Sequence, residues 1–163
     1  MQKILITAFA ILFANIAYTQ NADLPKPSAG KIERINLPSQ YVDTRAVDIW
    51  LPENYPSGEK YNVIYMHDGQ MLFDAAVTWN NQEWQVDETV SELMKNNKIQ
   101  NTIVVGIHNN GAKRLSEKLP QKAMNYLPED LRKKVDSVVI HGYLADNYLK
   151  FIVEELKPYI DKN

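Results

Sequence analysis

Two short apolar runs that each end in a histidine followed closely by a glycine constrain the fold more than any other feature. The first, Tyr61–Met66, ends at His67-Asp68-Gly69, and the second, Ile103–Ile107, ends at His108-Asn109-Asn110-Gly111. Such runs are typical of strands covered on both faces of a parallel sheet. The stretch between them carries apolar residues at helical spacing: Val86, Val90, Leu93 and Met94. The sequence therefore predicts a β-α-β unit whose loops after the strands face a ligand site.

A hairpin-like pair of strands is expected before this unit. Residues Arg45–Leu51 alternate in side-chain character, and Lys31–Leu37 fits the same pattern in part. Pro38, Ser39 and Asp43 supply turn residues between them. The fold class predicted is α/β.

The C-terminal third predicts helices. Pro120 and Pro128 bracket a short candidate at Glu129–Val135, whereas residues 138–140 fit either a strand or a helical turn. Asp146 is expected to cap a last helix with one apolar face, and Pro158 is expected to weaken its final turn.

The N-terminus has the layout of a signal peptide. Lys3 precedes an apolar run from Ile4 to Ala14, and the small residues Ala17 and Thr19 fit a cleavage site. The run is shorter than the roughly 20 apolar residues of a spanning helix, so a stable membrane anchor is disfavoured. We expect a signal peptide at 1–19, a linker at 20–30 and one domain at 31–163, in a secreted or periplasmic protein. The chain has no cysteine, so neither a disulfide nor lipid attachment at the cleavage site is available.

Charge argues against a nucleic-acid partner. The 18 Lys and Arg residues are outnumbered by 20 Asp and Glu, which gives a formal net charge of −2. A metal site at His67, Asp68, Asp74 and His108 is disfavoured because no metal-ligand spacing is present. No cofactor is expected.

The segment His67-Asp68-Gly69-Gln70 has two interpretations on its residues alone. Its backbone N–H groups can form an oxyanion loop, as after the third strand of some hydrolases. It can equally be a tight turn in which His67 makes a structural hydrogen bond.

Several motifs stand in a fixed order along the chain: Asp48-Ile49-Trp50-Leu51-Pro52, Tyr65-Met66-His67-Asp68-Gly69-Gln70, Trp84 with Asp87-Glu88, Val104-Val105-Gly106-Ile107 with Asn109 and Gly111, Arg114 with Glu117, and Leu156-Lys157-Pro158-Tyr159-Ile160. In this order they resemble the Putative esterase family of the α/β-hydrolase superfamily, which includes enterochelin-esterase-like and feruloyl-esterase-like enzymes. The resemblance runs from about Lys31 to the last residue. It implies an exported serine esterase that acts on acyl sugars, siderophores or hydroxycinnamate esters.

The resemblance also implies roles for individual residues. Gly69 and Gln70 become oxyanion-hole candidates in the loop with His67 and Asp68. Substrate-binding candidates are Trp84, Asn109, Arg114 and Glu117. Arg114 and Glu117 fit a solvated ion pair as well, and Trp79 and Trp84 fit packing against the sheet. Lys118 stands where the family usually has an aromatic residue.

The family's nucleophile motif is missing from this sequence. None of the six glycines frames a serine as G-x-S-x-G, and His67 and His108 precede the place where the serine would lie. The expected chain is therefore an N-terminal half of an α/β-hydrolase domain, truncated before the nucleophile and inactive alone. A fragmentary reading frame is one alternative, and a non-catalytic carbohydrate- or protein-binding module with the same fold is another. The strand Tyr61–Met66, lacking its second neighbour, is expected to be an exposed edge that permits self-association.

Overall fold

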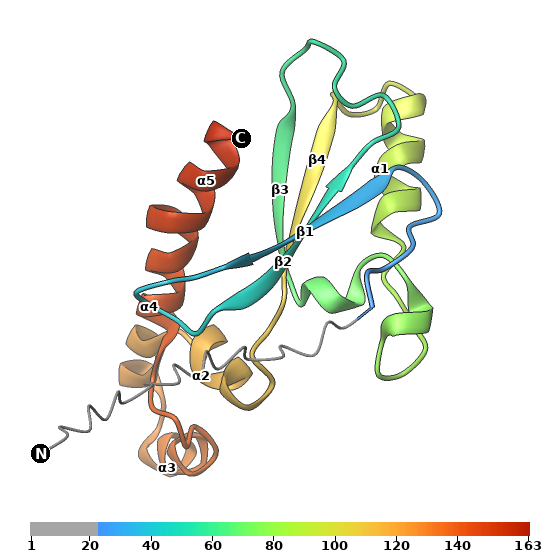
Figure 1. The fold of residues 1–163 in the computed structure, drawn as a ribbon. Coiled ribbons are helices and arrows are strands. Elements are labelled where there is room, and N and C mark those ends of the chain that lie inside the picture. The colour runs from blue at the N-terminus through green and yellow to red at the C-terminus, as the bar shows by residue number, and fades with distance from the viewer. Residues whose placement is uncertain (1–22) are drawn as a thin grey trace, which may run out of the picture.

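A computed structural model describes residues 23–163, so the predicted signal peptide lies outside the described residues. Its centre is a four-stranded sheet in the order β1-β2-β4-β3 (Figure 1). Strands β1 (Lys31–Leu37) and β2 (Arg45–Leu51) are antiparallel, and β2 pairs antiparallel with β4 (Thr102–Ile107). Strand β3 (Asn62–His67) runs parallel to β4. The hairpin and the β-α-β unit are therefore confirmed.

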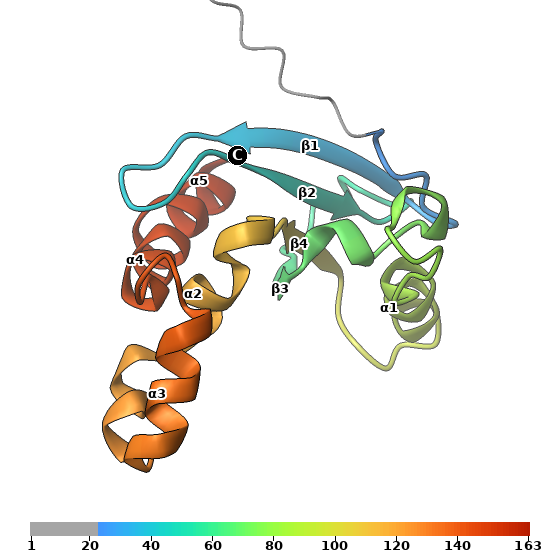
Figure 2. The ribbon, with the colours of Figure 1, turned by 90° about the horizontal axis from the view of Figure 1, so that it is seen from below.

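Helices cover both faces of the sheet and enclose two apolar clusters. On one face, helix α1 (Val86–Lys95) contributes Val86 and Val90 to a cluster with Trp50, Leu72 and Val104. On the other face, the C-terminal helix contributes Tyr148, Phe151 and Leu156 to a cluster with Val47, Val105 and Ile107. Figure 2 shows the two helical regions on opposite sides of the strands. Because β2 and β4 lie between them, both strands are buried on both faces.

The apolar run of β3 predicts a strand that is covered on both faces, but the structure differs. None of its residues is buried, and Ile64 keeps 40% of its surface exposed. Within residues 23–163 it pairs with β4 alone, so its other edge lacks a neighbour. The expected edge position is present in the described part of the chain.

The last helix runs without interruption through α4 (Ala145–Lys150), a π-helical turn (Phe151–Leu156) and α5 (Lys157–Lys162). The prediction that Asp146 caps it is wrong, because the helix starts after Leu144 and Asp146 lies in its first turn. Pro158 does not end the helix. The Lys157 N–H bonds to the Ile152 carbonyl five residues back, and this wider turn gives room to the ring of a proline that donates no hydrogen bond.

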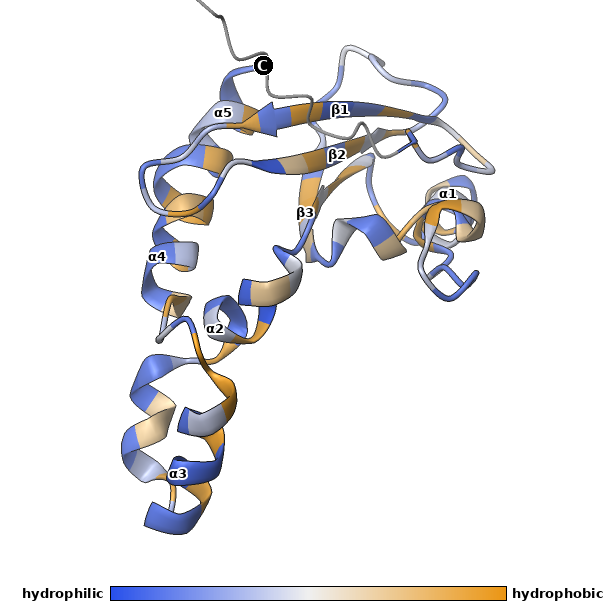
Figure 3. Cartoon of the chain, turned by 60° about the horizontal axis from the view of Figure 1, so that its bottom comes forward, coloured by the Kyte–Doolittle hydropathy of each residue, from blue (hydrophilic) through white to orange (hydrophobic). Residues whose placement is uncertain are grey.

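A helical hairpin projects from the body between β4 and the last helix (Figure 3). It follows α2 (Arg114–Lys118) and consists of a 3-10 turn at Gln121–Tyr126 and helix α3 (Glu129–Val138). Residue Val138 ends α3, which decides the open choice at residues 138–140 against a strand. No helix in residues 23–163 combines the length and apolar character needed to cross a membrane.

Residues 23–30, the described part of the predicted linker, form neither helix nor strand but contact the domain. The Ser28 and Ala29 N–H groups donate to Asp87 Oδ2 at 2.7 and 3.2 Å. Trp50 Nε1 donates to the Ala29 carbonyl at 2.7 Å. This segment is therefore fixed against α1 and β2.

Candidate active site

A left-handed residue turns the chain sharply at the end of β3. Asp68 has φ 57° and ψ 45°, a conformation that Asp tolerates better than most residues. Gly69 then starts a 3-10 turn, Gly69–Met71, directly against the backbone of β4. A Cβ atom on Gly69 would lie 2.4 Å from the Gly106 carbonyl oxygen, so this close approach requires glycine.

The Asp68 carboxylate joins the loops that follow β3 and β4. Arg114 donates from Nε and Nη2 to its two oxygens at 2.9 and 2.8 Å, and Asn109 Nδ2 donates at 2.6 Å. Lys118 Nζ lies 2.6 Å from Oδ1. The hydrogen bond from Arg114 is the main reason that the pKa of Asp68 lies well below its ordinary value. Asp68 is therefore an ionised anchor for the loops, and Lys118 uses the place of the usual aromatic residue for a charge contact.

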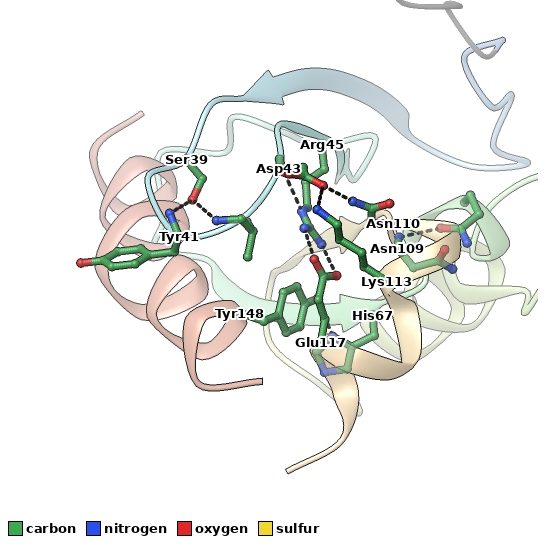
Figure 4. A network of polar contacts seen from close by, with 12 residues as sticks. Ser39, Tyr41, Asp43, Arg45, His67, Asn109, Asn110, Lys113, Glu117 and Tyr148 are labelled. Carbon is green, nitrogen blue, oxygen red and sulfur yellow. Dashed lines mark hydrogen bonds and ion pairs between the residues drawn. The ribbon is translucent and has the colours of Figure 1, made fainter. Parts of the chain in front are cut away.

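Glu117 is separated from Arg114 and buried in a second ion pair. Its two oxygens accept hydrogen bonds from Arg45 Nη2 and Nη1 at 2.6 and 2.9 Å (Figure 4). The Arg45 guanidinium also lies over the rings of Tyr148 and Phe151, 5.2 and 5.4 Å from their centroids. A solvated Arg114–Glu117 pair is therefore wrong. The two residues lie three apart on the short helix α2, and each reaches toward a different strand.

His67 is held by a buried tyrosine. Its Nδ1 lies 2.9 Å from the Tyr148 hydroxyl, which the last helix brings to the end of β3. Burial and the positive charge of Lys118 lower the pKa of His67. Both effects favour the neutral form of the imidazole. Burial also raises the pKa of Tyr148 well above its ordinary value, which keeps the phenol protonated.

His108 contacts a fully buried carboxylate in β2. Its Nε2 lies 2.8 Å from Asp48 Oδ2, and Arg34 donates to both Asp48 oxygens at 2.6 and 2.8 Å. Burial alone would raise the pKa of Asp48, but the bonds from Arg34 and His108 outweigh burial and lower it. Asp48 is thus a structural anion that orients His108 at the end of β4.

The turn after β3 borders a cavity of about 280 Å³. Gln70 and His108 line it together with Arg34, Ala76, Val77 and two residues of the N-terminal segment. The Gln70 side chain accepts a hydrogen bond from the Asn109 N–H at 3.2 Å. The backbone N–H of Gln70, in contrast, donates to no other residue of the described chain. A donor next to a cavity is what stabilisation of an oxyanion requires.

The structure brings together most of the predicted site residues. Asp68, Gln70, Asn109 and Arg114 are linked by hydrogen bonds, and His67 and Glu117 reach the same region through Tyr148 and Arg45. Trp84 lies apart with 52% of its surface exposed, and Trp79 is 85% exposed, so neither is packed against the sheet.

Sequence reasoning missed Arg45, Arg34 and Tyr148, whose side chains contact the site residues or the carboxylates that orient them. Arg45 and Arg34 lie in strand patterns that otherwise read as half-exposed, and Tyr148 lies in a helix. Their roles follow from their partners in the fold. Arg45 binds the buried Glu117, Arg34 binds the buried Asp48, and Tyr148 contacts His67 at the end of β3. No local spacing signals these pairs, which join residues far apart in the chain.

No described serine is activated by a histidine. All six serines lie within residues 23–163, and none of their hydroxyl groups hydrogen-bonds to His67, His108 or His141. The Ser39 hydroxyl accepts N–H bonds from Tyr41 and Val42 in the loop before β2 (Figure 4). The described residues thus contain no hydrogen-bonded serine–histidine pair.

This sheet, covered by helices on both faces and with a polar turn at the end of a parallel strand, defines a part of the α/β-hydrolase fold. The chain belongs to the Putative esterase family, whose model matches residues 39–163. The resemblance drawn from the sequence is thereby confirmed.

Solved structures support the same fold. A crystal structure of an IroE-like serine hydrolase from Shewanella oneidensis is 25% identical with a TM-score of 0.56, over 81% of this chain and 38% of that one. BES protein from Bacillus cereus is 20% identical with a TM-score of 0.53, over 86% of this chain and 48% of that one. A ferulic acid esterase from Anaeromyces mucronatus is 19% identical with a TM-score of 0.50, over 86% and 46%. The chain therefore spans less than half of the length of each. No curated protein sequence matches it.

Proposed function

We propose that this protein takes part in carboxylic-ester hydrolysis, and that residues 23–163 supply the oxyanion side of the site. The observation that carries the proposal is at Gln70, a residue that lines a cavity and whose backbone N–H donates no hydrogen bond within the described chain. In acyl transfer such a donor stabilises the negative oxygen of the tetrahedral intermediate. Family membership supports the same chemistry.

None of the serines of residues 23–163 stands in a G-x-S-x-G motif or hydrogen-bonds to a histidine. A site without one of its reacting groups keeps only the effects of binding and of the oxyanion hole. We therefore expect the 163-residue chain to have negligible turnover of nitrophenyl or feruloyl esters. Purified chain is assayed with both substrates, with and without a serine-directed phosphonate. Turnover that the phosphonate abolishes would refute this assignment.

The substrate class proposed is an ester of a sugar, a siderophore or a hydroxycinnamate. A ferulic acid esterase among the similar structures supports the last of these. Competition between methyl ferulate and an acetylated sugar for binding to the chain, followed by isothermal titration calorimetry, ranks the two.

Export is proposed on the basis of the leader pattern at Met1–Thr19. N-terminal sequencing of the product from the periplasm or the medium tests it. A product that begins at Gln20 supports export, and one that retains Met1 contradicts it.

A second candidate function is binding of a carbohydrate or a protein without catalysis. The two exposed tryptophans, Trp79 and Trp84, favour it because exposed indole rings stack on sugars and on partner surfaces. Saturable binding to a polysaccharide, lost in a Trp79→Ala and Trp84→Ala double variant, would support this function.

We propose that the chain self-associates through β3, because one edge of this strand has no neighbour in the described residues. Half-exposed apolar strands with free N–H and C=O groups pair with other chains. Light scattering on purified chain is expected to show dimers or larger species, which Ile64→Lys reduces. A clean monomer at high concentration would contradict this proposal.

A further inference from the structure

Three carboxylates gather at the N-terminal end of α1 and take no part in the site described above. The three residues are Glu83, Asp87 and Glu88, and each has one carboxylate oxygen within 4.8 Å of an oxygen of the other two. No Lys or Arg of residues 23–163 forms an ion pair with any of the three. The cluster thus brings up to three like charges together without a counter-ion from the described protein.

Two oxygens of this cluster are buried and lack a donor. Asp87 is fully buried, and its Oδ2 accepts the N–H groups of Ser28 and Ala29. Glu88 Oε1 accepts the Ser28 hydroxyl at 2.6 Å. The remaining oxygens, Asp87 Oδ1 and Glu88 Oε2, are buried and receive no hydrogen bond from an N–H or O–H donor of the described chain, and the Asp87 and Glu88 carboxyl groups interact directly with each other. Leaving a buried charged oxygen unpaired is costly, and neighbouring like charges add to that cost.

A hard cation would balance the charge of the three carboxylates and would also bind the two oxygens that receive no hydrogen bond. Carboxylate oxygens are the ligands of Ca²⁺, which accepts irregular geometry, whereas Mg²⁺ requires a near-ideal octahedron. Glu83 and Glu88 are half-buried, so one side of the cluster is open to water molecules that complete the coordination. The positive end of α1 opposes a cation here, which limits the affinity.

We propose that Glu83, Asp87 and Glu88 bind a Ca²⁺ ion. The ion neutralises the carboxylates that hold Ser28 and Ala29, and so fastens the N-terminal segment to α1. The expected dissociation constant is on the order of 10⁻⁴ to 10⁻³ M, the range of extracellular sites. This site is independent of the hydrolytic function proposed above.

Terbium luminescence tests the proposal because Trp84 follows Glu83 and can sensitise a bound Tb³⁺. The full chain is titrated with Tb³⁺ at pH 7.5, above the pKa of about 6 to which burial raises Asp87. We expect saturable emission that Ca²⁺ displaces and that Mg²⁺ at the same concentration leaves in place.

The variant Glu88→Gln keeps an oxygen for Ser28 but removes a charge, and it is expected to weaken Tb³⁺ and Ca²⁺ binding at least tenfold. Glu83→Gln should weaken binding in the same direction. Glu92→Gln, on the same helix but outside the cluster, is the matched control and should bind like the natural chain. Absence of saturable emission, as for a pair that merely shares a proton, would overturn the proposal. Equal affinity in Glu88→Gln and Glu92→Gln would overturn it as well.

Discussion

Arg114 and Asp68 meet through two hydrogen bonds, from Nε to Oδ1 at 2.9 Å and from Nη2 to Oδ2 at 2.8 Å. This pair ties helix α2 to the turn after β3, whose geometry the proposed oxyanion site depends on. Asp68 is itself left-handed, so its side-chain contacts and the shape of the turn stabilise each other.

Replacing Arg114 by Lys is expected to destabilise the fold by about 1 kcal/mol, because Lys cannot make the paired hydrogen bonds of a guanidinium. The side chain of Arg114 is half exposed, so solvent screening limits the loss. Urea unfolding measures the change. Arg132→Lys, on the exposed helix α3, is the control and should be neutral; an equal loss in both variants would remove the special role of Arg114.

The buried Arg45–Glu117 pair predicts strong non-additivity. Glu117→Gln alone should cost about 3 kcal/mol, because it leaves the Arg45 charge buried without its partner. The double variant Arg45→Met and Glu117→Met should lose less than Glu117→Gln, since it removes both charges together. A double-mutant cycle on unfolding free energies, built from Arg45→Met, Glu117→Met and the double variant, tests this. Additive losses would show that the pair does not couple β2 to α2.

Gly69→Ala should disrupt the turn after β3, because the added Cβ would meet the Gly106 carbonyl oxygen at 2.4 Å. We expect a loss of about 2 to 4 kcal/mol, as for other steric conflicts with a packed backbone. Gly111→Ala is the matched control, since nothing lies within 4 Å of its Cβ position. Similar thermal midpoints for the two variants would contradict the close approach of the two strands' ends.

Acid should weaken the fold partly through Asp68. Its pKa is lower in the folded chain than the ordinary value of 3.8, so the unfolded chain binds its proton first as pH falls. The stabilisation from Asp68 is therefore complete above pH 3.8 and declines below it, toward the lower folded-state pKa. Urea midpoints at pH 7, 5 and 3 measure this, and Asp68→Asn should remove part of the decline. An unchanged acid slope in that variant would contradict the assignment.

The strands and the turn after β3 were predictable because their signals are local. Tyr61–Met66 and Ile103–Ile107 are apolar runs that end at polar residues. Asp68-Gly69 marks the turn that follows the first of these runs. Local patterns also located the last helix, although not its first residue, because Asp146 is only one of several residues able to start it. The exposure of β3 was harder to judge from its own residues, since burial of a strand depends on neighbours that the strand does not encode.

The supporting network was not predictable from spacing. Glu117 looks like a partner of Arg114 along one helix, but Arg45, 72 residues away, takes it instead. His67 gains Tyr148, and His108 gains Asp48, in the same long-range way. Such pairs become visible only when the sheet order brings β2, β4 and the last helix together.

The most direct test of the oxyanion assignment is the amide resonance of Gln70 in a ¹⁵N spectrum during titration with methylphosphonate, which carries negative oxygens like those of the intermediate. We predict a saturable downfield shift of the Gln70 N–H that Gly69→Ala abolishes and Gly111→Ala retains. A Gln70 resonance that does not move, while amides elsewhere respond, would contradict the account.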